Sequence, residues 1–231
     1  MNILFLCAAL LVGVTTTHPS PAEIIHRLEA RYHGAETLQA EFLERYSEGR
    51  RSVHIESGRV FFRRPGQMRW EYEVPEKKLF IADGKFVWFY VPSDRTVTRA
   101  RTKESGDWRT PLGLLTGKAK LSRLCQGIEL VSRASNQEVG HAVLHCTPRK
   151  GKREKRTEPG GAAGESAESE FDEVLLEVDE GTGDLASVLV RQPGGVEIEY
   201  RFAHWDLNPK LSEALFKFVA PVGVAIVDEG S

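Results

Sequence analysis

The residues of this chain that could do chemistry form no complete catalytic motif. The segment from Gly113 to Ala119 resembles a phosphate-binding loop, but only the stretch Leu-Leu-Thr separates Gly113 from Gly117, where such a loop has four residues. Ala119 also stands where that loop needs a magnesium-binding hydroxyl. We therefore reject a nucleotide site here and expect no cofactor.

Two histidines, His141 and His145, lie at i and i+4 in a segment predicted to be a strand. This spacing does not build an enzyme-like zinc site without a glutamate partner, and the chain has no His-Glu-x-x-His motif. The chain also lacks a Gly-x-Ser-x-Gly nucleophile motif and a prominent pair of acids. We expect no metal site and no catalytic residue, so the chain is predicted not to be an enzyme.

The cysteines bear on the compartment. Cys7 lies within residues 1–17, whose apolar run and small-residue end are typical of a signal peptide, although no Lys or Arg precedes the run. A buried N-terminal strand or helix is the alternative. Export leaves Cys125 and Cys146 in an oxidising compartment, where a disulfide between them would stabilise the fold by roughly 3 kcal/mol. Two buried free thiols are the alternative to that bridge.

Composition describes an ordinary globular protein. With 231 residues, 41% of them hydrophobic and 28% charged, the chain is predicted to form a single domain over residues 18–231. The net charge of -2 argues against nucleic acid as a partner. Residues 149–170 are rich in charge and glycine and lack apolar residues to bury, so they are predicted to be a disordered insertion.

The elements that must position any site follow from local signals. A helix is predicted to begin after Ser20, which with Pro21 and Glu23 forms a capping box, and to end at Gly34. Short helices are predicted after Thr110-Pro111 and around residues 121–124. Antiparallel strands without parallel βαβ units are predicted over residues 38–46, 53–63, 68–74, 80–82, 86–91, 128–132, 142–147, 171–177, 185–192, 196–202 and 215–219.

The aromatic strands hold the strongest functional signal. Met68, Trp70 and Tyr72 alternate with charged residues, as in a sheet with one buried face. The run from Phe86 to Val91 is apolar on both faces. An exposed apolar face must be covered by something else, and its cover is the functional question.

Five segments, in order, resemble the periplasmic outer-membrane lipoprotein carrier family, LolA. They are Leu38-x-Ala40-x-Phe42, Phe61 to Pro65 followed by Met68-Arg-Trp70, Ile81 to Tyr90, Thr110-Pro111-x-x-Leu114-Leu115, and Phe216-x-Phe218 with Pro221-x-Gly223-Val224. The resemblance implies a mainly β fold with some α: an incomplete, curved antiparallel β-barrel capped by short lid helices.

The resemblance also implies a function. Lipoproteins would be bound through their acyl chains, received from an inner-membrane lipoprotein-releasing transporter and passed to an outer-membrane lipoprotein receptor by a soluble, monomeric periplasmic carrier. A carrier of another lipid, or a lipid-sensing regulatory protein of the same fold, is the alternative. No lipid-attachment cysteine is found, which favours a carrier over the lipoprotein receptor of the same fold.

The site residues are carried over by position. Arg64 matches an arginine that holds the lid shut by donating to lid carbonyls, and an ordinary exposed arginine is the alternative. Apolar residues matching the pocket, or else belonging to ordinary core, are Met68, Trp70, Trp88, Leu112, Leu114, Leu115, Ile24 and Leu28.

Overall fold

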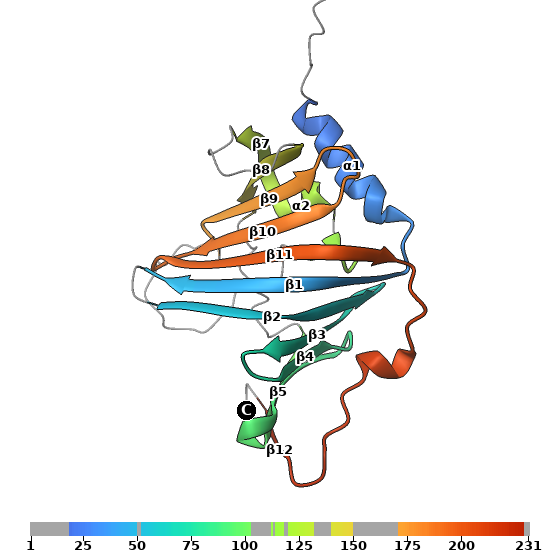
Figure 1. Cartoon of the computed structure of the whole chain (residues 1–231), viewed down its shortest axis with the longest axis vertical. Coiled ribbons are helices and arrows are strands. Elements are labelled where there is room, and N and C mark those ends of the chain that lie inside the picture. Colours follow the sequence, from blue (N-terminus) through green and yellow to red (C-terminus); the bar gives the residue numbers. More distant parts are fainter. Residues whose placement is uncertain are drawn as a thin grey trace, which may run out of the picture.

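The computed structural model describes residues 19–49, 52–102, 112, 114–117, 120–131, 140–149 and 171–228. The predicted signal peptide, the Thr110-Pro111 helix start and residues 150–170 of the predicted insertion lie outside these ranges. The described chain is dominated by one open, curved sheet of twelve strands, with α1 lying obliquely against one half of it (Figure 1). The predicted curved, mainly antiparallel β fold is confirmed.

Sheet order differs from chain order at the centre of the sheet, where β1 pairs with β11, and at one edge, where β12 pairs with β6. The order is β12-β6-β5-β4-β3-β2-β1-β11-β10-β9-β8-β7, so β1 lies between β2 and β11 and joins the two halves of the chain. The strands are β1 (Thr37–Glu48), β2 (Ser52–Arg63), β3 (Gln67–Val74), β4 (Lys78–Ala82), β5 (Phe86–Val91), β6 (Thr96–Arg101), β7 (Cys125–Val131), β8 (His141–Pro148), β9 (Glu173–Asp179), β10 (Leu185–Gln192), β11 (Val196–Leu207) and β12 (Ala225–Asp228). The helical elements are α1 (Pro21–His33), α2 (Leu121–Leu124), η1 (Pro92–Asp94) and η3 (Glu213–Phe216).

Local signals explain α1. Ser20 Oγ accepts from the Glu23 backbone N–H, while the Glu23 carboxylate accepts from the Ser20 N–H at 2.7 Å. Both reciprocal hydrogen bonds of the capping box are therefore formed. Ile24, Leu28 and Tyr32 recur at helical spacing and are fully buried against the sheet. The predicted helix is confirmed.

A glycine in β2 permits close strand contact where the β2–β3 register shifts. A Cβ on Gly58 would lie 1.8 Å from the Glu71 backbone oxygen, so no other residue fits there without movement. A register shift of this kind is where a strand bends and twists more strongly. It therefore supports the curvature of this half of the sheet.

The chain's own C-terminal segment covers the second apolar face of the aromatic strands. Phe216 is fully buried, and Phe218 stacks on Trp88 with the ring centroids 5.3 Å apart. Arg69 donates to the Leu215 carbonyl at 3.0 Å from the same face. The prediction of a strand over 215–219 is wrong, because this segment lies across the face of the sheet through its side chains.

The last strand joins an edge that was predicted to be antiparallel. β12 pairs with β6 in parallel, and among the described strands this is the one parallel pair. Arg99 holds it with two bonds to the Asp228 carboxylate, at 2.5 and 2.8 Å. The long C-terminal segment, which passes the strand ends before returning to this edge, makes a parallel approach possible without a crossover helix (Figure 1).

Candidate functional site

A short turn lies over the concave face at the end of β2. This lid turn, defined as Leu112 and residues 114–117, is closed by the Leu115 N–H donating to the Leu112 carbonyl at 2.9 Å and the Gly117 N–H donating to the Leu114 carbonyl at 3.2 Å. Leu112 and Leu115 are fully buried, and Leu114 is nearly so. The turn therefore covers apolar surface with its leucines.

Arg64 binds those carbonyls. Its Nε donates to the Leu115 oxygen at 3.3 Å, and its Nη2 to the Leu114 oxygen at 3.2 Å. Its Nη1 donates to the His33 carbonyl at the end of α1, also at 3.3 Å. One guanidinium thus joins the lid turn to α1, which a single ammonium group could not do with the same geometry.

The surroundings of Arg64 are unusual for a cation. The side chain is partly buried, and this burial lowers the pKa of Arg64 from its ordinary value. Its described hydrogen bonds all go to backbone carbonyls and none to a carboxylate. Arginine remains charged in proteins, so the partial charges of three carbonyl oxygens offset the lost hydration.

Gly117 shapes the contact between the lid turn and Arg64. Its φ is +72°, and a Cβ would lie 2.7 Å from Arg64 Cδ. Next to it, the Gly66 N–H donates to the Thr116 carbonyl at 3.0 Å. The absence of a side chain therefore lets the turn lie directly on the arginine.

The surface under the lid turn is aromatic and tightly packed. Trp70 is fully buried, with its ring centroid 4.7 Å from that of Phe42 and 5.1 Å from that of Tyr200. One contiguous cluster holds all but one of the predicted pocket residues: Ile24, Leu28, Met68, Trp70, Leu112, Leu114 and Leu115. We call it the inner cluster. Trp70 Nε1 is buried in it without a hydrogen-bond partner, which costs free energy in an apolar site.

Trp88 is the exception, and its predicted place in the pocket is corrected. In the β3–β4–β5 register, Trp70 is opposite Phe80, which is opposite Phe89, whereas Trp88 is opposite Ile81. Neighbours in register share a face, so Trp88 lies on the other face from Trp70. There it stacks on Phe218 and donates to Asp83 Oδ2 at 3.0 Å.

Several inner-cluster residues were missed from sequence. Tyr200 and Phe202 on β11 and Trp205 after them pack against the predicted residues. The alternation Ile198, Tyr200, Phe202 was a usable signal for a buried face. It did not show that β11 lies beside β1, because strand neighbours far apart in sequence are set by the whole fold.

α1 is bound to the turn between β9 and β10. The Tyr32 hydroxyl accepts from the Leu185 N–H at 2.9 Å, and burial raises the pKa of Tyr32. Arg31 Nε lies 2.6 Å from Asp184 Oδ1. A Cβ on Gly183 would lie 2.8 Å from the Arg27 carbonyl oxygen, so the turn packs directly on the helix backbone.

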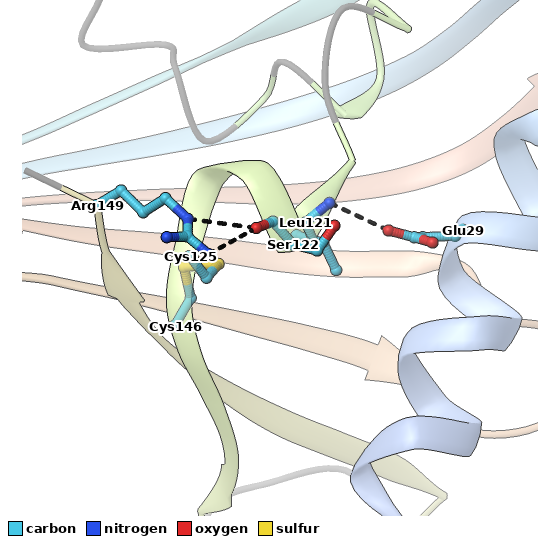
Figure 2. The surroundings of a disulfide bond; sticks show 6 residues. All are labelled: Glu29, Leu121, Ser122, Cys125, Cys146 and Arg149. Atoms are coloured by element: carbon cyan, nitrogen blue, oxygen red, sulfur yellow. Dashed lines mark hydrogen bonds between the residues drawn. A yellow bond between two sulfur atoms is a disulfide. The ribbon is translucent and has the colours of Figure 1, made fainter. Parts of the chain in front are cut away.

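α2 lies beside the lid turn and is held at several points (Figure 2). Cys125, directly after α2, forms a disulfide with Cys146 on β8, with the Cα atoms 5.4 Å apart. Glu29 of α1 accepts from the Leu121 N–H at 3.1 Å. Arg149 donates to the Ser122 carbonyl at 3.1 and 3.3 Å. α2 is therefore joined to both α1 and the sheet.

The histidines rejected as metal ligands have carboxylate neighbours instead. His141 Nδ1 lies 3.1 Å from Glu177 Oε1, and His145 Nε2 lies 3.3 Å from Glu173 Oε1. Within the described ranges, no three or more His, Cys, Asp and Glu side chains gather as a metal site would require. The same part of the chain contains no helix of the length and hydropathy needed to cross a membrane.

Residues 33–157 match the family model described as outer membrane lipoprotein carrier protein LolA. A protein named outer-membrane lipoprotein carrier protein from Nitrosospira multiformis is 28% identical over 220 residues, covering 95% of this chain and 94% of that protein. One of the same name from Dechloromonas aromatica is 28% identical over 194 residues, covering 84% and 82%.

A crystal structure of an uncharacterised conserved protein from Thermus thermophilus has a similar fold. Its TM-score is 0.51 at 14% identity, covering 90% of this chain and 98% of that chain. At that identity the likeness concerns the fold alone.

Proposed function

This chain belongs to the LolA family of outer membrane lipoprotein carrier proteins, and from that membership we propose that it binds lipoprotein acyl chains beneath the lid turn. In this proposal it is an exported, monomeric periplasmic carrier that acts by binding, without catalysis. Cargo would come from an inner-membrane transporter and pass to an outer-membrane receptor.

The observation that carries the proposal is the pairing of a buried apolar cluster with a polar fastening. Leu112, Leu114 and Leu115 cover the inner cluster, while their turn is fastened to β2 and α1 through Arg64. A core built only for stability does not need a short apolar turn whose side-chain hydrogen bonds come from one arginine. Acyl chains have the same chemistry as the leucine side chains that would leave.

The free energies are of comparable size. Burying a leucine contributes about 1.5–3 kcal/mol, so three leucines contribute about 5–9 kcal/mol. A long acyl chain offers on the order of 10 kcal/mol, at about 0.8 kcal/mol per methylene. Because the lid turn and the lipid compete for one surface, net affinity stays modest, and cargo can pass to a surface that binds it better.

Competition makes a distinctive prediction for binding of a lipophilic fluorescent dye. Replacing Leu115 by alanine weakens the competing lid turn, so dye affinity should rise about tenfold, the equivalent of roughly half the burial free energy of one leucine. The matched control is Leu43→Ala, because Leu43 is 40% exposed on β1 and outside the inner cluster. Absence of dye binding in every variant, or weaker binding by Leu115→Ala than by Leu43→Ala, would contradict the proposal.

Two further measurements address the cargo. Native mass spectrometry of protein purified from its own cells should show acylated polypeptide bound; a different lipid would establish the alternative carrier function. Arg64→Leu protein should load cargo but pass it on more slowly, because closure of the lid turn no longer displaces the chains. Transfer at the normal rate would exclude this role for Arg64.

A further inference from the structure

A second site lies on the outer side of the lid turn. An open pocket of about 640 Å³ separates α1 from the lid turn and α2. We call it the rim pocket; its walls come from α1, from Arg64 directly after β2, from the lid turn, and from Lys120 and Arg123 at α2. The polar side chains that line it are His26, Glu29, His33, Arg64, Lys120 and Arg123.

The charge of the rim pocket is the reverse of that of the chain. Arg64, Lys120 and Arg123 bring three positive charges and Glu29 brings one negative charge, in a protein whose net charge is -2. Glu29 is engaged by the Leu121 N–H, as Figure 2 shows. His26 and His33 can add further N–H donors.

These cations lack the acidic partners that similar residues have nearby. On α1, which also lines the pocket, Arg31 is paired with Asp184. No described carboxylate forms an ion pair with Lys120, Arg123 or Arg64, and Arg64 is partly buried as well. Burial lowers the pKa of Arg64 because the charged guanidinium loses hydration.

We propose that the rim pocket binds a phosphate group. Phosphate offers several charged acceptor oxygens, which can accept from a guanidinium fork and an ammonium at the same time. The volume lies within the range of small-molecule sites and exceeds what one phosphate fills, so an attached headgroup fits as well. The phosphate could come from a lipid headgroup or from free phosphate.

The position of the rim pocket connects it to the lid turn. Leu114 lines the pocket while its carbonyl accepts from Arg64. A lipid whose chains took the place of the lid leucines would have its headgroup at this rim. That connection rests on the proposed function, whereas binding of inorganic phosphate does not depend on it.

Isothermal titration calorimetry at low salt tests the site. The probes are inorganic phosphate, dihexanoyl phosphatidic acid and the uncharged dihexanoyl glycerol. The variant is Lys120→Ala/Arg123→Ala, since both side chains are exposed and outside the inner cluster. The matched control is Lys210→Ala/Lys217→Ala, which removes the same charge from exposed positions on the C-terminal segment.

Phosphate affinity should fall about tenfold in the Lys120/Arg123 variant, as expected for losing two exposed charge contacts, and stay unchanged in the control. Tighter binding of phosphatidic acid than of phosphate, with the same dependence on these residues, identifies a lipid headgroup. Equal binding of the two probes identifies free phosphate.

The proposal is overturned if phosphate does not bind or if both double variants lose affinity equally. Binding of an acidic peptide but not of phosphate also overturns it and points to a protein-docking surface. If dye binding depends on Leu115 but phosphate does not bind, the phosphate-site proposal is overturned and the carrier function is still supported. Phosphate binding without binding of the dye or of dihexanoyl glycerol would support the rim pocket and contradict the carrier function.

Discussion

Two elements cover the concave face of the sheet, and they are held in different ways. α1 has a complete capping box, a buried tyrosine bonded to the sheet and an ion pair to the β9–β10 turn. The lid turn is short, and its side-chain fastening is Arg64, whose three bonds go to backbone carbonyls. α1 therefore has more side-chain anchors than the lid turn, and the proposed function requires the lid turn, not α1, to move.

α2 is also anchored more firmly than the lid turn. Its disulfide to β8 and its contact with Glu29 join it to the sheet and to α1 (Figure 2). The lid turn thus has anchored elements beside it, and Arg64 is the side chain that donates to its carbonyls. Movement confined to the turn would expose the inner cluster while leaving α1 and α2 in place.

The largest expected effect on the free energy of unfolding comes from truncating a buried leucine in α1 and comparing it with a leucine in the lid turn. Leu28→Ala in α1 should lower the free energy of unfolding by about 3 kcal/mol, because buried methyl groups are lost from an anchored helix. Leu115→Ala should cost less than half of that, because the lid turn can open locally without global unfolding. Urea denaturation measures both. Equal losses would mean that the turn is as integral to the fold as the helix.

The next effect concerns the fastening itself. Arg64→Leu removes the two hydrogen bonds that Arg64 makes to the lid turn, worth about 2 kcal/mol together, so the lid turn should open roughly 30-fold more often. Hydrogen exchange at the Leu115 and Gly117 amides measures the opening, and the amides of α1 serve as the internal control. Arg64→Lys should rescue it only partly, because an ammonium lacks the planar fork. Unchanged exchange in Arg64→Leu would show that leucine burial and the bond from the Gly66 N–H to the Thr116 carbonyl hold the turn without Arg64.

Tyr32→Phe addresses the anchoring of α1. The Leu185 N–H loses its acceptor, so the free energy of unfolding should fall by about 1–2 kcal/mol, as measured by urea denaturation. The effect should also depend on pH. Because burial raises the pKa of Tyr32, the folded state keeps its proton at a pH where the unfolded chain, with a tyrosine pKa near 10, loses it.

The folded state therefore binds more protons above about pH 10, and stability falls there as pH rises. The wild-type protein should lose more stability than Tyr32→Phe between about pH 9 and 11, which narrows the difference between them. Parallel curves over this range would show that Tyr32 ionises equally well in both states.

The smallest effect belongs to the ion pair on the same helix. Asp184→Asn removes the charge partner of Arg31, and both side chains are about one-third exposed, so the expected loss is about 0.5 kcal/mol. The loss should shrink further in high salt because exposed charges are screened. Thermal unfolding at low and high salt provides the measurement. A loss above that of Tyr32→Phe would make the ion pair the main anchor of α1.

Much of the fold followed from short-range signals. The capping box from Ser20 to Glu23 and the apolar spacing of Ile24, Leu28 and Tyr32 predicted α1, because both act within a few turns of one helix. Alternation in β3 predicted that Met68, Trp70 and Tyr72 share a buried face. The contact of Arg64 with the lid turn was expected from resemblance, and its bond to the His33 carbonyl was not foreseen.

Other features were decided only by the tertiary structure. The run from Phe86 to Val91 is apolar throughout, so alternation could not say which face Trp88 takes; register with β4 placed it on the face opposite to that of Trp70. The segment 215–219 has strand-like composition, yet it covers that second face because an apolar surface was available there. The charges of the rim pocket come from segments far apart in sequence. The sequence by itself determined α1 and the alternating strands with their apolar faces, because those depend on local periodicity. Which faces meet, and which of the described cations have no carboxylate partner, depended on long-range packing.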